Sequence, residues 1–199
     1  MTVAQAIERF KFRMEDPNGD VWDDDDVIMS ILDTNQTLSV KLLFDSGQFE
    51  YLKELQDSAS NTLASGRMVL STSSFFRLAS VQRNSDKIFI PIKPLPAETP
   101  RSPMMQNDDL TEFAYYWNGY VYVHGGTNGV SYTSFWIDKP TTVDSNLEES
   151  GDFSVNEYVQ ELMLKLSQIE GWIIDNQPDR SMAIAKQLPI TYGVKLDAI

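Results

Sequence analysis

Four side chains with oxygen ligands near the start of the chain have almost the spacing of a calcium-binding loop: Asp16, Asn18, Asp20 and Asp24. EF-hand loops begin with the pattern D-x-[DN]-x-[DN] because Ca²⁺ prefers a shell of oxygen ligands. Here the glycine stands at the fourth loop position instead of the sixth, and Val27 replaces the bidentate Glu. We therefore interpret the segment as a solvated turn followed by an acidic helix start, and we predict no metal site.

The only histidine, His124, begins a His-Gly-Gly sequence similar to the oxyanion loops of esterases. No G-x-S-x-G motif accompanies it, and the same imidazole would also have to be the general base. Residues 125–129 contain three glycines but precede a predicted strand and lack the Lys-Ser/Thr of a phosphate loop. Zero cysteines exclude disulfides, thiolate nucleophiles and cysteine-ligated metals. We predict that the protein is not an enzyme and that it holds no cofactor.

Aromatic side chains gather between residues 113 and 136 and could stack on a sugar or a base. Aromatics are also preferred in strands and at protein–protein interfaces, where they bury a large area at low entropic cost. We favour a core or interface role and keep a ligand platform as the alternative. The aromatic residues concerned are Tyr115, Trp117, Tyr120, Tyr122, Tyr132, Phe135 and Trp136.

The elements that carry these side chains are marked by turns and caps. Asn118-Gly119 separates two strand-like runs, 113–117 and 120–124, and favours a type I′ hairpin turn. A third run, 130–137, completes a predicted β-meander. Residues 153–158 then combine a capping box, Ser154 with Glu157, and a hydrophobic staple, Phe153 against Tyr158, so a long helix is predicted to start there.

Composition limits the class of protein. A chain of 199 residues with 42% hydrophobic content can bury a core and is predicted to form one domain, residues 1–199. No run is long and apolar enough for a membrane span, and we expect a cytosol-like compartment without membrane contact. The formal net charge of −13 argues against gripping nucleic acid, which requires Lys and Arg at phosphates. Solubility alone is the competing explanation for this charge.

The first part of the chain is predicted to be helical, over residues 1–65. Thr2 and Gln5 form a capping box before a helix over residues 3–14, and acidic residues 23–26 start a second helix that reaches about Phe44. We expect the two to pack as an antiparallel helical hairpin. Short strand-like runs follow at 68–70, 75–81 and 87–92, and a proline-rich loop over residues 93–109 is a candidate contact arm.

The carboxy-terminal part is predicted to contain two helices and a tail. Pro178 suits the first turn of a short helix that ends near Leu188. Residues 189–199 have apolar side chains at alternate positions, which indicates an extended docking tail that is mobile in the free subunit and ordered by a partner. The predicted partner-binding residues are Ile190, Tyr192, Val194, Leu196 and Ile199.

The predicted fold class is therefore α+β. It comprises an amino-terminal helical hairpin, a small antiparallel β-meander or barrel over residues 66–140, carboxy-terminal helices over residues 152–188, and the extended tail over residues 189–199.

This order of elements resembles the head-to-tail adaptor proteins of tailed phages, also called connector or tail tubular proteins of the podovirus type. The similar features are the helical start, the run 75–81, the strand that ends in residues 136–140, the capped helix from Phe153 and the tail. The resemblance implies a structural virion protein, assembled in the host cytoplasm, that forms a dodecameric ring. Such a ring binds the portal protein and other tail proteins, and its helices surround a channel through which DNA passes without specific binding.

A channel for DNA should have an acidic surface, which denies phosphates a basic partner. The carboxylates that we assign to it are Asp23, Asp24, Asp25, Asp26, Glu148, Glu149 and Asp152. The competing hypothesis is a binding module that recognises a glycan or peptide with the aromatic meander. Another structural protein of the same virion is a third.

Overall fold

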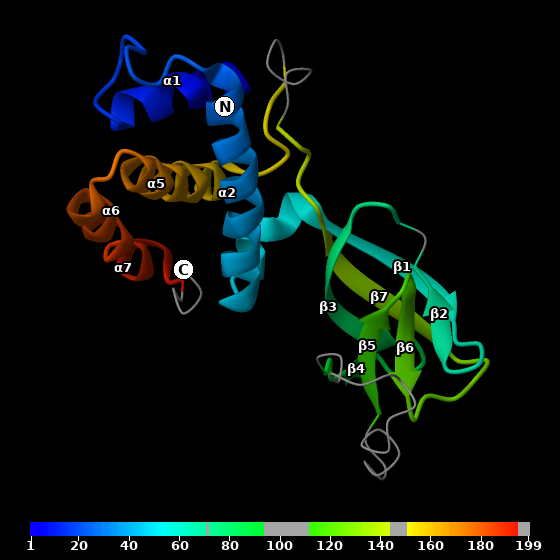
Figure 1. The fold of residues 1–199 in the computed structure, drawn as a ribbon. Helices are drawn as coiled ribbons and strands as arrows, with labels where there is room; N and C mark the ends of the chain where they lie inside the picture. The colour runs from blue at the N-terminus through cyan, green and yellow to red at the C-terminus, as the bar shows by residue number, and fades with distance from the viewer. Residues whose placement is uncertain (71, 94–111, 144–150, 195–199) are drawn as a thin grey trace. The chain divides into compact units, whose positions relative to one another are not determined.

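The computed structural model describes residues 1–70, 72–93, 112–143 and 151–194. The chain divides into a helical unit, Met1–Leu55 with Pro140–Ile199, and a sheet unit, Gln56–Lys139 (Figure 1). The predicted α+β class is confirmed. The predicted helical part extends too far, because residues 56–62 form a strand of the sheet unit. The proline-rich loop lies outside the described residues except for its first residue, Lys93.

The helical unit contains α1 (Val3–Arg13), α2 (Asp25–Asp45), the 3₁₀ segment η1 (Phe49–Leu55), α5 (Glu157–Ile174), α6 (Pro178–Ala185) and α7 (Leu188–Tyr192). Several of these helices begin at residues whose side chains favour a helix start. The Thr2 hydroxyl accepts the N–H of Gln5, and the Gln5 side chain accepts the N–H of Thr2, which confirms the first capping box. The Asp24 carboxylate caps α2, and Pro178 opens α6 as predicted.

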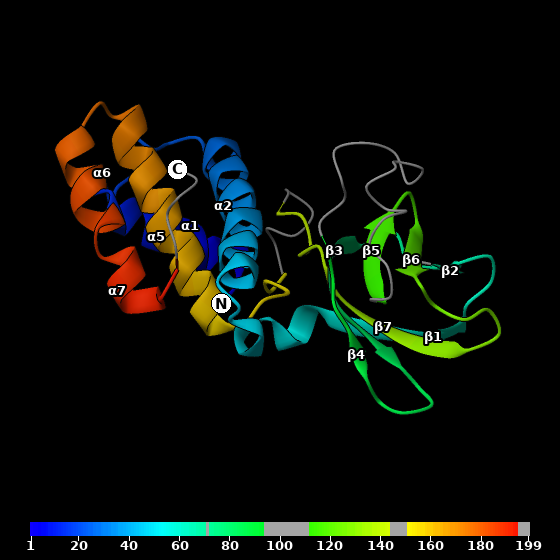
Figure 2. The ribbon, with the colours of Figure 1, turned by 90° about the horizontal axis from the view of Figure 1, so that it is seen from below.

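The long helix α5 organises the helical unit. It lies between α2 and the α6–α7 pair (Figure 2) and buries a stripe that includes Leu162, Met163 and Leu166. The predicted antiparallel pairing of α1 with α2 is wrong, since α1 runs across α2 (Figure 1). A glycine on α5 explains why α1 packs on α5. A Cβ on Gly171 would lie 2.7 Å from Met14 Sδ and 3.2 Å from Phe10 Cζ. The missing side chain lets α1 approach α5 closely.

The predicted capping box of α5 is also wrong. The N-cap is Asn156, whose side chain accepts the N–H of Val159 at 3.1 Å. Its amide group donates to the carbonyl of Tyr51 at 2.7 Å and to Glu54 at 3.0 Å, so it also joins α5 to η1. The Ser154 hydroxyl accepts the N–H of Thr141 instead. Ser154 and Asn156 each bond to a distant segment of the chain, and the N-cap therefore lies at Asn156, two residues after the predicted Ser154.

The sheet unit holds two small antiparallel sheets. The first has the order β1-β7-β3-β4, with β1 (Gln56–Thr62), β7 (Ser131–Asp138), β3 (Phe75–Arg83) and β4 (Phe89–Ile90). The second has the order β2-β6-β5, with β2 (Arg67–Val69), β6 (Tyr120–His124) and β5 (Phe113–Trp117). One core cluster combines side chains of both sheets, among them Val81 and Trp136 from the first and Val121 and Val123 from the second.

The sheets correct the predicted meander and barrel. The hairpin at Asn118-Gly119 is confirmed, with φ of 47° and 81° at its two turn residues. The third strand does not continue that hairpin: β7 pairs along its length with β1 and β3 in the other sheet. The two sheets are not closed into a barrel. The cause is the buried face of β7, where Tyr132 and Trp136 pack in the shared core.

Tyr132 connects this core to a carboxylate. Its side chain is almost fully buried, and its hydroxyl donates to Glu112. Burial raises the pKa of Tyr132 to about 12, with the hydrogen bond to Glu112 adding to the effect. Both causes favour the neutral phenol, so this residue is a structural element of the sheet unit.

The formal charge of the chain is not shared by the two units. Residues 56–139 contain seven Lys or Arg and seven Asp or Glu residues, so the sheet unit has no net charge. The helical unit contains the other nine basic and 22 acidic residues, and therefore the whole formal charge of −13. Any effect of net charge on a polyanion originates in the helical unit.

Candidate interaction surfaces

The predicted docking tail is partly a helix that packs on its own unit. Residues 188–192 form α7, and Gly193 ends it with φ of 62°, which an L side chain rarely adopts. Tyr192 and Val194 are buried, and the Tyr192 ring lies edge-on to Tyr158 with centroids 5.3 Å apart. Gln48 donates to the carbonyl of Tyr192 at 2.8 Å. The prediction of an extended segment is therefore wrong for residues 189–192.

Among the three described residues that were predicted to bind a partner, only Ile190 is accessible, since 87% of its surface is exposed. Burial raises the pKa of Tyr192, consistent with its position in the helical core. Leu196 and Ile199 lie outside the described residues. The periodicity was misleading because five residues are too few to distinguish a turn of helix from alternation.

The predicted channel carboxylates do not form one cluster. Asp24 caps α2, and Asp25 forms an ion pair with Lys11 at 2.8 Å, near the end of α1. Asp152 lies 3.7 Å from the amino group of Met1, at the opposite end of α1. At about 1.5 Å per residue, these two positions are separated by more than two helical turns. Asp23 and Asp26 are exposed at the start of α2, whereas Glu148 and Glu149 lie outside the described residues.

The calcium-like segment is a closed turn. The carboxylate of Asp16 accepts the N–H groups of Trp22 at 2.7 Å, Val21 at 2.9 Å and Asp20 at 2.9 Å. These hydrogen bonds hold the pKa of Asp16 below its usual value, and the bond from Trp22 has the largest effect. Burial of the carboxylate acts in the opposite direction. Asp16 is buried, not solvated as the sequence suggested. Its oxygens serve the backbone, which explains the Asp at this position without a metal.

The predicted aromatic residues divide between the smaller sheet and strand β7 of the larger sheet. On the outer face of the smaller sheet Tyr115 stacks on Tyr122 with centroids 5.0 Å apart, and Phe113 stacks on His124 at 4.7 Å. Trp117 and Tyr120 extend the same face. Tyr132 and Trp136 belong to the core instead, and Phe135 lies on the other sheet. The structure therefore gathers four of the seven predicted aromatics, and burial of Tyr115 raises its pKa.

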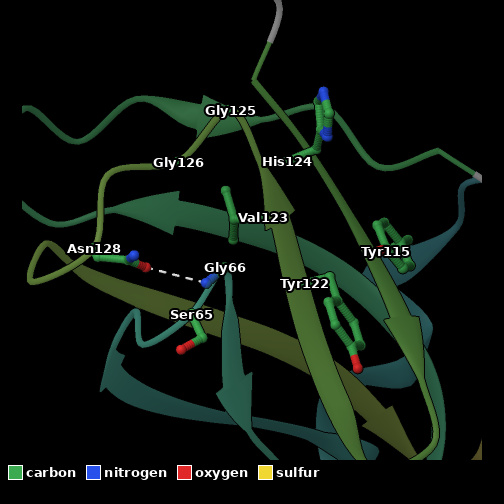
Figure 3. A pocket seen from close by; sticks show the side chains of 9 residues that line it. All are labelled: Ser65, Gly66, Tyr115, Tyr122, Val123, His124, Gly125, Gly126 and Asn128. Atoms are coloured by element: carbon green, nitrogen blue, oxygen red, sulfur yellow. Dashed lines mark hydrogen bonds between the residues drawn. The ribbon is translucent and has the colours of Figure 1, made fainter. Parts of the chain in front are cut away.

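A hollow of about 280 Å³ opens beside this aromatic face (Figure 3). Its lining includes His124, Tyr122, Ser65 and the backbone of Gly125 and Gly126. Ser65 and His124 stand at opposite ends of the hollow in Figure 3, so they do not form a nucleophile–base pair. The Asn128 carboxamide already accepts the N–H of Gly66 at 3.0 Å. The lining can stack on and hydrogen-bond a polar ligand.

A second hollow, which the sequence did not indicate, lies in the helical unit and has a volume of about 200 Å³. Val21, Trp22 and Val27 from the loop and start of α2 meet Ile174 from the end of α5, and we call this the apolar hollow. Three acidic residues, Asp23, Asp24 and Asp175, complete its lining, and we call these three the acidic rim. Its residues come from segments about 150 positions apart in the chain, and only tertiary packing unites them.

Comparison with known proteins identifies no family: no family model matches the chain, and no curated protein is significantly similar to it. Within the described residues, no group of three or more His, Cys, Asp or Glu side chains is arranged to hold a metal ion. Among the same residues, no helix is both long and apolar enough to cross a membrane.

Proposed function

We propose that this protein is a structural subunit of a phage virion, a head-to-tail adaptor that forms a ring between the portal and the tail. The ring contains about twelve copies, binds the portal protein on one side and tail proteins on the other, and lets DNA pass through its channel. The subunit performs no catalysis. This proposal extends the resemblance in element order described above.

The observation that carries the proposal is the charge division between the two units. The helical unit bears the whole formal charge of −13, and the sheet unit is neutral. A wall of exposed carboxylates denies the DNA phosphates a basic partner, so the duplex is not retained. A neutral unit can meet neighbouring proteins without this repulsion. In the proposed ring, the acidic helical units surround the channel and repel DNA, and the neutral sheet units lie away from the channel and contact other proteins.

Exposed apolar side chains on the helical unit add support. Phe12, Ile173, Met182 and Ile190 are all large and exposed. Single exposed apolar residues are ordinary, but several on one small, highly charged unit favour contact with other proteins. Assembly would bury these side chains while the carboxylates stay in water.

The second candidate function is ligand binding by the sheet unit. The stacked pair Tyr115–Tyr122 and the hollow beside His124 would suit a glycan or a peptide. This alternative needs only a monomer. It explains neither the charge of the helical unit nor its exposed apolar residues, so we rank it below the adaptor.

Native mass and imaging of the purified protein test the proposal. An adaptor assembles, alone or on addition of portal protein, into closed rings whose mass is about twelve times 22.6 kDa. The binding module stays at 22.6 kDa under both conditions and binds glycan or peptide probes. Retention of duplex DNA at ~0.15 M salt, with a steep salt dependence, would contradict the proposed acidic channel.

A further inference from the structure

The apolar hollow is unusually exposed for so apolar a surface. Val21, Val27 and Ile174 expose 69%, 45% and 57% of their surfaces. They line the hollow together with Trp22 and the three residues of the acidic rim. Three large side chains in contact with water at one place, inside an acidic rim, indicate a site that a partner covers.

The hollow is held in a fixed shape. Asp16 binds the three backbone N–H groups of residues 20–22, and the Trp22 ring packs edge-on against Phe10 with centroids 5.0 Å apart. The Asp24 side chain caps α2 beside it. A partner would therefore spend little free energy on ordering this loop, which is the property of a preorganised interface.

The size and the charge of the hollow define its partner. A volume of about 200 Å³ lies below the ~300–1,000 Å³ typical of small-molecule pockets, and it suits one or two inserted side chains. The rim of Asp23, Asp24 and Asp175 favours a cation beside them. The expected partner is a protein knob with a large apolar tip and a neighbouring Lys or Arg.

The chain itself carries such a knob, the β3–β4 turn of residues 84–89 in the neutral sheet unit. Ile88 and Phe89 expose 50% and 60% of their surfaces. Lys87 precedes them and forms no ion pair within the described part of the chain, whereas Arg83 is held by Asp86 and Glu112. The turn is closed by two backbone bonds between Arg83 and residues 87 and 88, at 3.0 and 2.8 Å.

We propose that the β3–β4 turn of a second copy of this chain occupies the apolar hollow. Phe89 and Ile88 cover Val21, Val27 and Ile174, and Lys87 lies among the rim carboxylates. The inference rests on the proposed ring and names the contact between its neighbours. Asp23 and Asp24 then belong to the subunit interface instead of the channel surface.

The charges of the two units favour a contact between a helical unit and a sheet unit over a contact between two helical units. Two helical units placed face to face would each bring the charge of −13 and repel, whereas a helical unit and a sheet unit do not. A contact between two different surfaces of the same chain is heterologous, so each copy can bind two neighbours, and the series closes into a ring if the rotation from one subunit to the next completes a full turn.

Complementation between two single-surface variants tests the contact. Ile174→Asp blocks the hollow, and Phe89→Asp blocks the knob. Each is expected to weaken self-association at least about tenfold in analytical ultracentrifugation, as for a buried interface anchor. Mixed together, they restore one intact contact and form a 1:1 dimer that cannot grow. Thr37→Asp, an exposed substitution on α2 of the same helical unit, is the matched control and should assemble like the parent chain.

The outcomes separate the contact from the proposed function. If the parent chain and both blocked variants all form rings, the contact is wrong and the ring stands. If the mixture of variants stays monomeric, the contact is not heterologous and the inference fails. A parent chain that remains monomeric up to ~1 mM also overturns it, since even weak specific contacts are populated there. The adaptor function would then depend on the portal mixing experiment alone. Circular dichroism and melting temperatures equal to those of the parent chain are required of every variant.

Discussion

The helical unit and the sheet unit differ in how they handle polar and charged groups. The helical unit carries the whole formal charge and also buries polar side chains, among them Gln36, Asn35 and Ser39 on α2. The sheet unit is neutral, and its core is almost entirely aliphatic and aromatic. It depends on turn residues with positive φ, such as Asn118 and Gly119, for its strand order.

This difference suits the two units to different roles. A neutral unit with an apolar core and tight turns is suited to a defined shape for protein contact. Repulsion between like charges lowers the stability of a highly charged unit, and a buried polar group without a hydrogen-bond partner lowers it further. The proposed roles follow the same division: the sheet unit contacts neighbours, and the helical unit repels DNA.

The largest expected effect is on the sheet unit alone. Gly119→Val places a β-branched residue at φ of 81°. Nothing lies within 4 Å of the added Cβ, so the expected loss of stability comes from the backbone conformation and not from a steric clash with neighbours. We expect a loss of about 2–3 kcal/mol from backbone strain. Chemical denaturation followed by aromatic fluorescence measures it. Gly119→Asn is the control, because Asn tolerates positive φ; equal losses for the two variants would contradict the turn assignment.

The next effect concerns the helical core. Gln36 is fully buried, and neither of its side-chain polar atoms has a hydrogen-bond partner within the described residues. Replacing it with Met, similar in shape and apolar, should stabilise the protein by about 1–2 kcal/mol. Gln160→Met is the matched control: Gln160 is also buried, but it donates to the Val155 carbonyl at 2.6 Å, so its loss should destabilise. Thermal melts that shift in the same direction for both would refute this assignment.

A smaller effect distinguishes the true cap of α5. Asn156→Ala removes the cap and the bonds to Tyr51 and Glu54, with an expected loss of about 1–2 kcal/mol. Ser154→Ala removes one bond to the Thr141 N–H at the surface and should cost less than about 1 kcal/mol. Urea denaturation of the two variants gives the order, and the reverse order would restore the capping box predicted from the sequence.

The smallest expected effect is a pH dependence of the helical unit. The pKa of Asp16 is lowered from 3.8 by its backbone hydrogen bonds, so the folded state binds the proton less tightly than the unfolded state. This contribution to stability is fully present above the unfolded value of 3.8 and is lost as the pH falls through the lower, folded value. Asp16→Asn should flatten the acid limb of the stability curve. An unchanged acid limb, measured by denaturation between pH 2 and 5, would show that the closed turn contributes nothing through ionisation.

The sequence predicted the elements that local signals define. Capping at Thr2, acidic residues at the start of the second helix, Pro178 at a first turn and Asn118-Gly119 in a hairpin all act within a few residues. Strand β1 was not predictable, because its polar run Gln-Asp-Ser-Ala-Ser-Asn-Thr has no apolar alternation and is stabilised by pairing with β7.

The candidate sites were less predictable than the fold. The predicted tail residues separate into exposed Ile190 and buried Tyr192, which α7 turns to different faces, and Val194, which is buried after the helix has ended. The apolar hollow depends on Val21 and Ile174, which meet only after α1 and α5 have packed. Tertiary contact, not local pattern, decides both outcomes.

The position of the helical unit in the assembled ring tests the central claim most directly. The chain has no cysteine, so Thr37→Cys on the helical unit and Thr127→Cys on the sheet unit each provide one exposed site for a gold label. End-on electron micrographs of labelled rings give the radius of each label. Our account predicts that the Thr37→Cys label lies nearer the channel and the Thr127→Cys label farther from the axis. The reverse order of radii, or the absence of any ring with or without portal protein, would contradict it.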